Sequence, residues 1–208
     1  DIKILEREGA AKEFPAEIVA KVEEMDKTMT EEQKHELVNN IIVKTQGFVN
    51  GNISEGDKEP IRKFKGLLEL YKGIDKDKLR ENMKYFLNAI MPVCEKWDIN
   101  MCVHPDDPPM EVLGLPRIVR TAEDIRWMLN AVDNPHNGLT FCAGSLSAGE
   151  QNEVVDMAKE FASRTHFVHM RSCNVLGGGN FIEAPHTKGR GHLVELCRIF
   201  TTEERRRN

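Results

Sequence analysis

INMCVHP (99–105) is the first of three short apolar runs that decide the fold of this chain, and GLTFCAGS (138–145) and THFVHMRS (165–172) are the others. Each run has the length of a buried strand, and helix-type apolar patterns lie between them. Strands that alternate with helices in this way are typical of a parallel sheet with crossover helices. We therefore predict β-α-β-α-β-α order in the second half of the chain.

The segments around these runs complete the pattern. Thr121 is in a position to cap a helix, a second helix is predicted over residues 154–161, and a last one at about 191–200. We expect the glycine-rich stretch VLGGGNF (175–181) to be a loop. Three strands fit either a small open α/β sheet or an incomplete piece of a (β/α)8 barrel, which needs roughly 250 residues.

The first part of the chain is predicted to be helical. Ile18, Val22 and Met25 recur at helical spacing, and TEEQ (30–33) resembles a capping box that opens a helix reaching about Ile42. We expect a loop over 47–60 and a second helical block over 60–96, which Pro92 should kink or shorten near its end.

Composition narrows the class of protein. The 208 residues carry a net charge of −5, with a pI of about 5.9, which argues against a nucleic-acid partner. No apolar run approaches the roughly 20 residues that a membrane helix needs, and no signal-peptide pattern is present. Five cysteines without a CxxC pair argue against a disulfide framework, so we expect a cytoplasmic protein.

Each of the three runs carries a potential metal ligand near its end: His104, Cys142 and His169. Because side chains alternate along a strand, these ligands are predicted to face the barrel axis, and the ends of neighbouring parallel strands meet at one mouth. Two imidazoles and a thiolate suit Fe²⁺, Co²⁺ or Zn²⁺, and Mn²⁺ less readily. Any one of these residues alone is more often core packing than a ligand.

The other polar residues near these strand ends each allow a functional or a structural interpretation. Arg171 shares the face of His169, and it fits either a substrate carboxylate or an ion pair with a neighbouring carboxylate. His186 follows the third strand and could reach the mouth, whereas His166 is predicted to face the helices in a structural role. HPDDPP (104–109) fits a rigid loop that holds His104 in place, and the glycines at 177–179 form no dinucleotide fingerprint.

Four motifs in this order resemble the mannonate dehydratase family: VHPDDPP (103–109), GLPRI (114–118), HNGLTFCAGS (136–145) and HFVHMRS (166–172). The resemblance covers roughly residues 60–200. It implies a (β/α)8 TIM barrel of the xylose-isomerase-like kind, with its C-terminal half over 61–208 and a helical insertion over 1–60.

The resemblance also implies dehydration of D-mannonate to 2-keto-3-deoxy-D-gluconate with Fe²⁺ or Mn²⁺. His104, Cys142 and His169 match three of the family's four metal ligands, while the Asp ligand and its neighbouring His have no match here. Arg171 and Arg117 are then expected to bind the sugar acid, and His186 is the remaining candidate base. A metal-dependent sugar isomerase and a non-catalytic interaction module stay open, and a homo-oligomer is possible.

Overall fold

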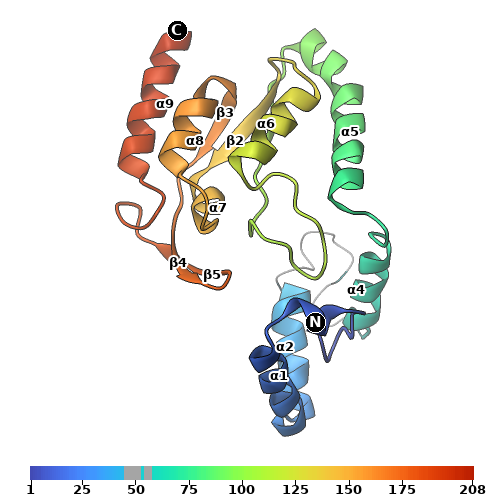
Figure 1. Cartoon of the computed structure of the whole chain (residues 1–208). Coiled ribbons are helices and arrows are strands. Elements are labelled where there is room, and N and C mark those ends of the chain that lie inside the picture. The colour runs from blue at the N-terminus through green and yellow to red at the C-terminus, as the bar shows by residue number, and fades with distance from the viewer. Residues whose placement is uncertain (45–52, 54–57) are drawn as a thin grey trace. The chain divides into compact units, whose positions relative to one another are not determined.

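The computed structural model describes residues 1–44, 53 and 58–208, and it divides into two compact units (Figure 1). One unit contains residues 1–73 with 113–115, and the other contains 74–112 with 116–208. The helices are α1 (Ala16–Thr28), α2 (Glu31–Val38), α4 (Pro60–Glu69), α5 (Lys76–Trp97), α6 (Ala122–Ala131), α7 (Ala143–Ala148), α8 (Val154–Phe161) and α9 (Leu193–Arg207). The strands are β1 (Met101–Val103), β2 (Asn137–Cys142), β3 (Thr165–His169), β4 (Ser172–Gly177) and β5 (Asn180–Ala184).

The second unit is built on a parallel sheet in the order β1-β2-β3. Val103 pairs with Leu139 between the first two strands, and Cys142 pairs with His169 between the second and third. Helix α6 connects β1 to β2, and α7 and α8 connect β2 to β3. The predicted alternation of strands and helices is therefore confirmed, in an α/β fold.

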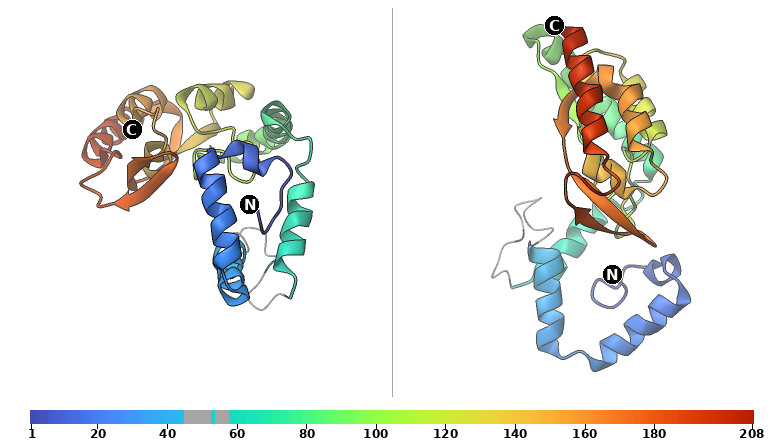
Figure 2. Two further views of the ribbon diagram at one scale, coloured as in Figure 1. Left: turned by 60° about the horizontal axis from the view of Figure 1, so that its bottom comes forward. Right: turned by 90° about the vertical axis from the view of Figure 1, so that its left-hand side faces the viewer.

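The core of this unit lies between the sheet and its crossover helices. Strand β2 is buried along its whole length, and Phe141 is fully inaccessible. Ile125 and Met128 of α6 and Met157 of α8 join the same apolar cluster. The Thr121 hydroxyl accepts a hydrogen bond from the backbone N–H of Asp124, so the predicted cap of α6 is confirmed. Helices α8 and α9 lie side by side in Figure 2.

The glycine-rich stretch after β3 is not the simple loop that the sequence suggested. Strands β4 and β5 form an antiparallel hairpin, in which Val175 pairs with Phe181. Gly177, Gly178 and Gly179 all have positive φ angles, so they form the tight turn of the hairpin. The prediction failed because three consecutive glycines hide the strands on either side of the turn.

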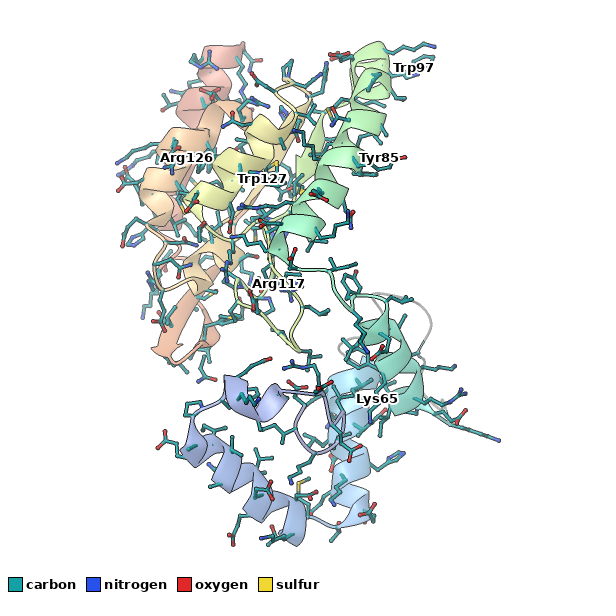
Figure 3. All side chains as sticks on the ribbon, turned by 45° about the vertical axis from the view of Figure 1, so that its right-hand side comes forward. Lys65, Tyr85, Trp97, Arg117, Arg126 and Trp127 are labelled. Atoms are coloured by element: carbon teal, nitrogen blue, oxygen red, sulfur yellow. The ribbon has the colours of Figure 1, made fainter. Side chains whose placement is uncertain are left out.

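Helix α5 runs directly into β1 and is fixed at its first turn by a buried carboxylate. Lys76 and Arg80 both bond Asp124 at the start of α6, at 2.8 and 2.7 Å. Pro92 lies inside α5, which continues to Trp97, so the prediction that this proline shortens the helix is wrong. Figure 3 shows Tyr85 and Trp97 on this helix, and both side chains are mostly exposed.

The first unit is helical, as predicted. The Thr30 side chain accepts from the backbone N–H of Gln33, whose side chain accepts in return from the N–H of Thr30, so the capping box is confirmed. Helix α2 continues as a π-helical segment, Asn39–Lys44. The predicted loop over 47–60 lies mostly outside the described residues. No helix in the described part of the chain is long and apolar enough to cross a bilayer.

Candidate metal centre

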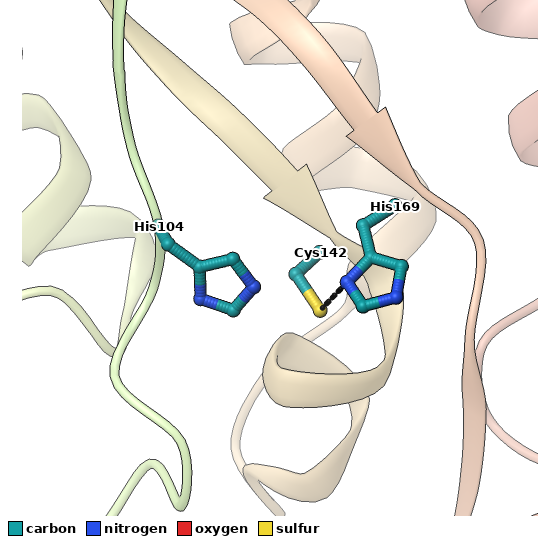
Figure 4. Close-up of side chains that lie close together, drawn as sticks. All are labelled: His104, Cys142 and His169. Atoms are coloured by element: carbon teal, nitrogen blue, oxygen red, sulfur yellow. Dashed lines mark hydrogen bonds between the residues drawn. The ribbon is translucent and has the colours of Figure 1, made fainter. Parts of the chain in front are cut away.

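The three predicted ligands meet at the carboxyl ends of the three parallel strands. His104 directly follows β1, while Cys142 and His169 are the last residues of β2 and β3. Their ligand atoms all lie within 4.8 Å of one another, and the Sγ of Cys142 is 3.3 Å from the Nδ1 of His169 (Figure 4). The register of the sheet explains this short distance, because Cys142 and His169 are direct partners across it.

The His104 ring contacts the backbone of the next residue. Its Nδ1 lies 2.7 Å from the carbonyl oxygen of Pro105. A carbonyl can only accept, so Nδ1 carries the proton and Nε2 keeps its lone pair. The ring centroids of His104 and His169 are 6.0 Å apart. The Nε2 atom of His104 is therefore the ring nitrogen that can bind a metal ion beside the Cys142–His169 pair.

The geometry of this group, which we call the triad (His104, Cys142, His169), fits one divalent ion. Metal–nitrogen bonds of about 2.1 Å and metal–sulfur bonds of about 2.3 Å place two ligand atoms roughly 3 to 4 Å apart. The 3.3 Å between sulfur and nitrogen falls in that range, and ligand atoms at the 4.8 Å limit would have to approach one another by about 1 Å to share an ion. Cys142 is fully buried while both histidines are exposed, so one side of the group stays open to solvent.

The sulfur of Cys142 has polar contacts on the side of α7. The hydroxyl of Ser145 lies 3.1 Å from it and the backbone N–H of Ser145 lies 3.5 Å from it. The same hydroxyl is 3.2 Å from an Oδ2 oxygen of Asp107. Asp107 thus joins the HPDDPP loop to the residues around the sulfur.

Arg171 lies two residues beyond His169 and is paired with two carboxylates. One of its Nη atoms bonds Asp107, and its Nε donates to Glu183 of β5 at 2.8 Å. Partial burial lowers the pKa of Arg171, but the hydrogen bonds to Asp107 and Glu183 outweigh it and hold that pKa above its usual value. The side chain is therefore a permanent cation close to the triad. Its ion pairs with Asp107 and Glu183 are those expected if Arg171 has a structural role.

Asp106 fixes the loop that carries His104. Its Oδ2 accepts from the backbone N–H groups of Ile118 and Val119 at 2.7 and 2.8 Å. Its own N–H donates to the carbonyl of Val119 at 2.8 Å. Three bonds to one short segment hold the HPDDPP loop after β1, which is the role expected of a rigid support.

The remaining candidates lie outside the triad. Arg117 has an Nη1 atom 3.8 Å from Asp106. His186 is exposed and lines a cavity of about 310 Å³ with His192 and residues at the start of α9. His166 has its Nε2 2.9 Å from the carbonyl oxygen of Pro135. The roles predicted for Arg117 and His186 stay predictions.

Ser145, Asp107 and Glu183 are contacts of the site that sequence reasoning did not assign. For Ser145 a signal was available, because Cys142 and Ser145 stand three residues apart at a strand-to-helix junction. That spacing is typical of an N-cap side chain that accepts from the third helical N–H. Nothing in the sequence pairs Asp107 or Glu183 with Arg171, since 64 and 12 residues separate them.

Comparison with known proteins identifies the family of this chain. Residues 8–207 match the family described as D-mannonate dehydratase (UxuA). A mannonate dehydratase from Marinomonas sp. (strain MWYL1) is 41% identical over 209 residues, which is 100% of this chain and 52% of that protein. A mannonate dehydratase from Saccharophagus degradans is 39% identical, over 100% of this chain and 51% of its own length. The chain thus spans about half the length of these relatives.

A solved structure supports the same relationship. The crystal structure of mannonate dehydratase from Streptococcus suis serotype 2 is similar with a TM-score of 0.65 at 30% sequence identity. The similarity covers 72% of this chain and 44% of that one. Because the family match extends over nearly all of the sequence, the chain belongs to the D-mannonate dehydratase family.

Proposed function

We propose that this chain carries the metal-binding half of an enzyme that dehydrates D-mannonate to 2-keto-3-deoxy-D-gluconate. The observation that carries the proposal is the triad, in which two imidazoles and a thiol from three strands lie within 4.8 Å. Family membership and relatives named mannonate dehydratase support the substrate. The β1-β2-β3 order supports a place in the C-terminal half of a (β/α)8 barrel over 61–208, with 1–60 as a helical insertion.

The resemblance to the family favours Fe²⁺ or Mn²⁺ as the ion, and of these two the imidazole and thiolate donors suit Fe²⁺ better. His104 would bind through its free Nε2, and Cys142 and His169 would complete three positions, which leaves others open. When bound, a divalent cation stabilises as a Lewis acid the negative charge that develops when a proton α to a carboxylate is removed. The exposed faces of both histidines would let a small sugar acid reach the open positions.

Arg171 would hold the carboxylate of the sugar acid. Its raised pKa keeps it cationic at any pH at which the protein is folded, and it lies just beyond a ligand of the triad. A guanidinium binds a carboxylate through two parallel hydrogen bonds, which fixes orientation as well as charge. In this role the substrate would compete with Asp107 and Glu183 for the same N–H groups.

The test measures metal binding and product formation on the same 208-residue protein. Fe²⁺ or Mn²⁺ should bind the chain, and Cys142→Ser and His169→Ala should abolish that binding together with any formation of the 2-keto-3-deoxy acid from D-mannonate. Cys197→Ser, which changes an exposed cysteine on α9, is the matched control and should change neither. Turnover that survives both triad substitutions would contradict the proposal, and turnover of a ketose instead of mannonate would favour an isomerase.

A further inference from the structure

Ser145 contacts the sulfur of Cys142 although it is not one of the three candidate metal ligands. It is fully buried at the third position of α7, a helix of fewer than two turns. Its hydroxyl lies between the sulfur of Cys142 at 3.1 Å and the Oδ2 of Asp107 at 3.2 Å. Another serine of the same helix, Ser147, is also buried, but its hydroxyl donates to the carbonyl of Gly144 at 3.1 Å.

A hydroxyl has one proton, so Ser145 can donate to only one of its two acceptors at a time. The Oδ2 of Asp107 already accepts from the guanidinium of Arg171. A metal-bound sulfur has no proton of its own, and besides the hydroxyl it accepts only the backbone N–H of Ser145 at 3.5 Å among the described contacts from α7. The Oδ2 atom already has a charged donor, whereas the sulfur has only a neutral backbone N–H at 3.5 Å, so the hydroxyl proton adds more at the sulfur.

We infer that Ser145 is a positioning residue that donates its hydroxyl proton to the Cys142 thiolate and so fixes its direction and electron density toward a bound metal ion. This inference rests on the proposed metal site and adds a residue to it. Groups that orient a metal ligand in this way are commonly worth about 10- to 100-fold in metal affinity. The backbone N–H bond to sulfur does not depend on the side chain, so α7 keeps its cap when the hydroxyl is removed.

The test uses Co²⁺ as the probe, because a cobalt–thiolate bond gives a charge-transfer absorption band in the near ultraviolet. Co²⁺ is titrated into the 208-residue chain and into Ser145→Ala, Ser145→Thr and Ser147→Ala. Loss of a hydrogen bond raises the energy of the sulfur electrons, so in Ser145→Ala the band should move to longer wavelength. The Co²⁺ affinity of this variant should fall by about tenfold or more.

Ser147→Ala should keep the band position and affinity of the unchanged chain, and Ser145→Thr, which keeps a hydroxyl, should restore both. If the extra methyl group of Ser145→Thr does not fit, the comparison of Ser145→Ala with Ser147→Ala still tests whether the Ser145 hydroxyl acts on the sulfur. A Ser145→Ala protein with the original band and affinity overturns the inference and leaves the metal site standing, as does an equal change in both alanine variants. Absence of the band in the unchanged chain overturns the metal site and the inference together.

Discussion

Gly144→Ala is expected to displace Arg171 without touching a residue of the triad. A Cβ atom at Gly144 would lie 2.5, 2.6 and 2.8 Å from the Cγ, Cδ and Cβ of Arg171. Ordinary carbon contacts are about 3.5 to 4.0 Å, so the stem of Arg171 must retreat by roughly 1 Å. These atoms are close to the backbone, and the retreat therefore pulls the guanidinium away from Asp107 and Glu183.

Opposing effects determine how much Gly144→Ala changes the free energy of unfolding. Alanine in a helix is favoured over glycine by about 0.5–1 kcal/mol. Overpacking a filled site costs about 1–3 kcal/mol. The weakened hydrogen bonds of Arg171 to its carboxylates contribute only about 1 kcal/mol, since all three side chains are partly exposed. We expect a net loss of about 1–3 kcal/mol in the free energy of unfolding.

Urea unfolding followed by tryptophan fluorescence measures this loss in the second unit, which contains Gly144 and Arg171, because Trp97 and Trp127 both lie there. Gly66→Ala is the control for helix propensity, since Gly66 lies inside α4 with nothing within 4 Å of the added carbon. Circular dichroism should show that this control is stabilised by about 0.5–1 kcal/mol. A Gly144→Ala protein as stable as the unchanged chain would refute the placement of Arg171 against α7.

Three further changes test the second unit, each by urea unfolding. Burial raises the pKa of Asp124, but the hydrogen bond and charge of Lys76, the backbone N–H of Arg120 and the charge of Arg80 together outweigh this and leave that pKa below its usual value. The carboxylate thus stabilises the fold above the unfolded pKa of about 3.9, and this stability is lost as pH falls through the lower folded pKa. Asp124→Asn should lower the free energy of unfolding by about 2 kcal/mol at pH 7 and should weaken the dependence of that free energy on pH in the acid range. A variant whose stability falls with acid as steeply as that of the unchanged chain would contradict this. Asn137→Ala should cost about 2–3 kcal/mol, because the buried Asn137 amide donates to the backbone carbonyls of Met128 and Val132, and a cost near zero would contradict those bonds. Phe141→Ala should cost about 3–5 kcal/mol in the free energy of unfolding by leaving a cavity in the core, and a much smaller cost would contradict the burial of this side chain.

The sheet and the triad could be predicted because both depend on local pattern. A buried run such as LTFC fits a strand wherever it occurs, and parallel strands bring their ends together without further information. The alternation within HFVHMR likewise predicted that His169 and Arg171 share a face. The structure brings His104, Cys142 and His169 together as the pattern indicated.

The rest of the site depends on contacts between distant segments. Asp107 reaches Ser145 across 38 residues and Arg171 across 64, and no periodicity connects them. The hairpin of β4 and β5 was missed because the glycines at its turn outweighed the short strands beside them. Pro92 was expected to kink or shorten α5, but the helix continues to Trp97, and the buried side chains of Leu87, Met91 and Cys94 pack on both sides of the proline.

The central claim is that His104, Cys142 and His169 hold one metal ion. X-ray absorption at the metal edge tests it most directly, on the 208-residue chain loaded with one equivalent of Fe²⁺ or Mn²⁺ and on Cys142→Ser. The account predicts one metal–sulfur bond of about 2.3 Å and nitrogen neighbours near 2.1 Å, with the sulfur lost in the variant. An ion surrounded by oxygen alone, or a spectrum that the substitution leaves unchanged, would contradict it.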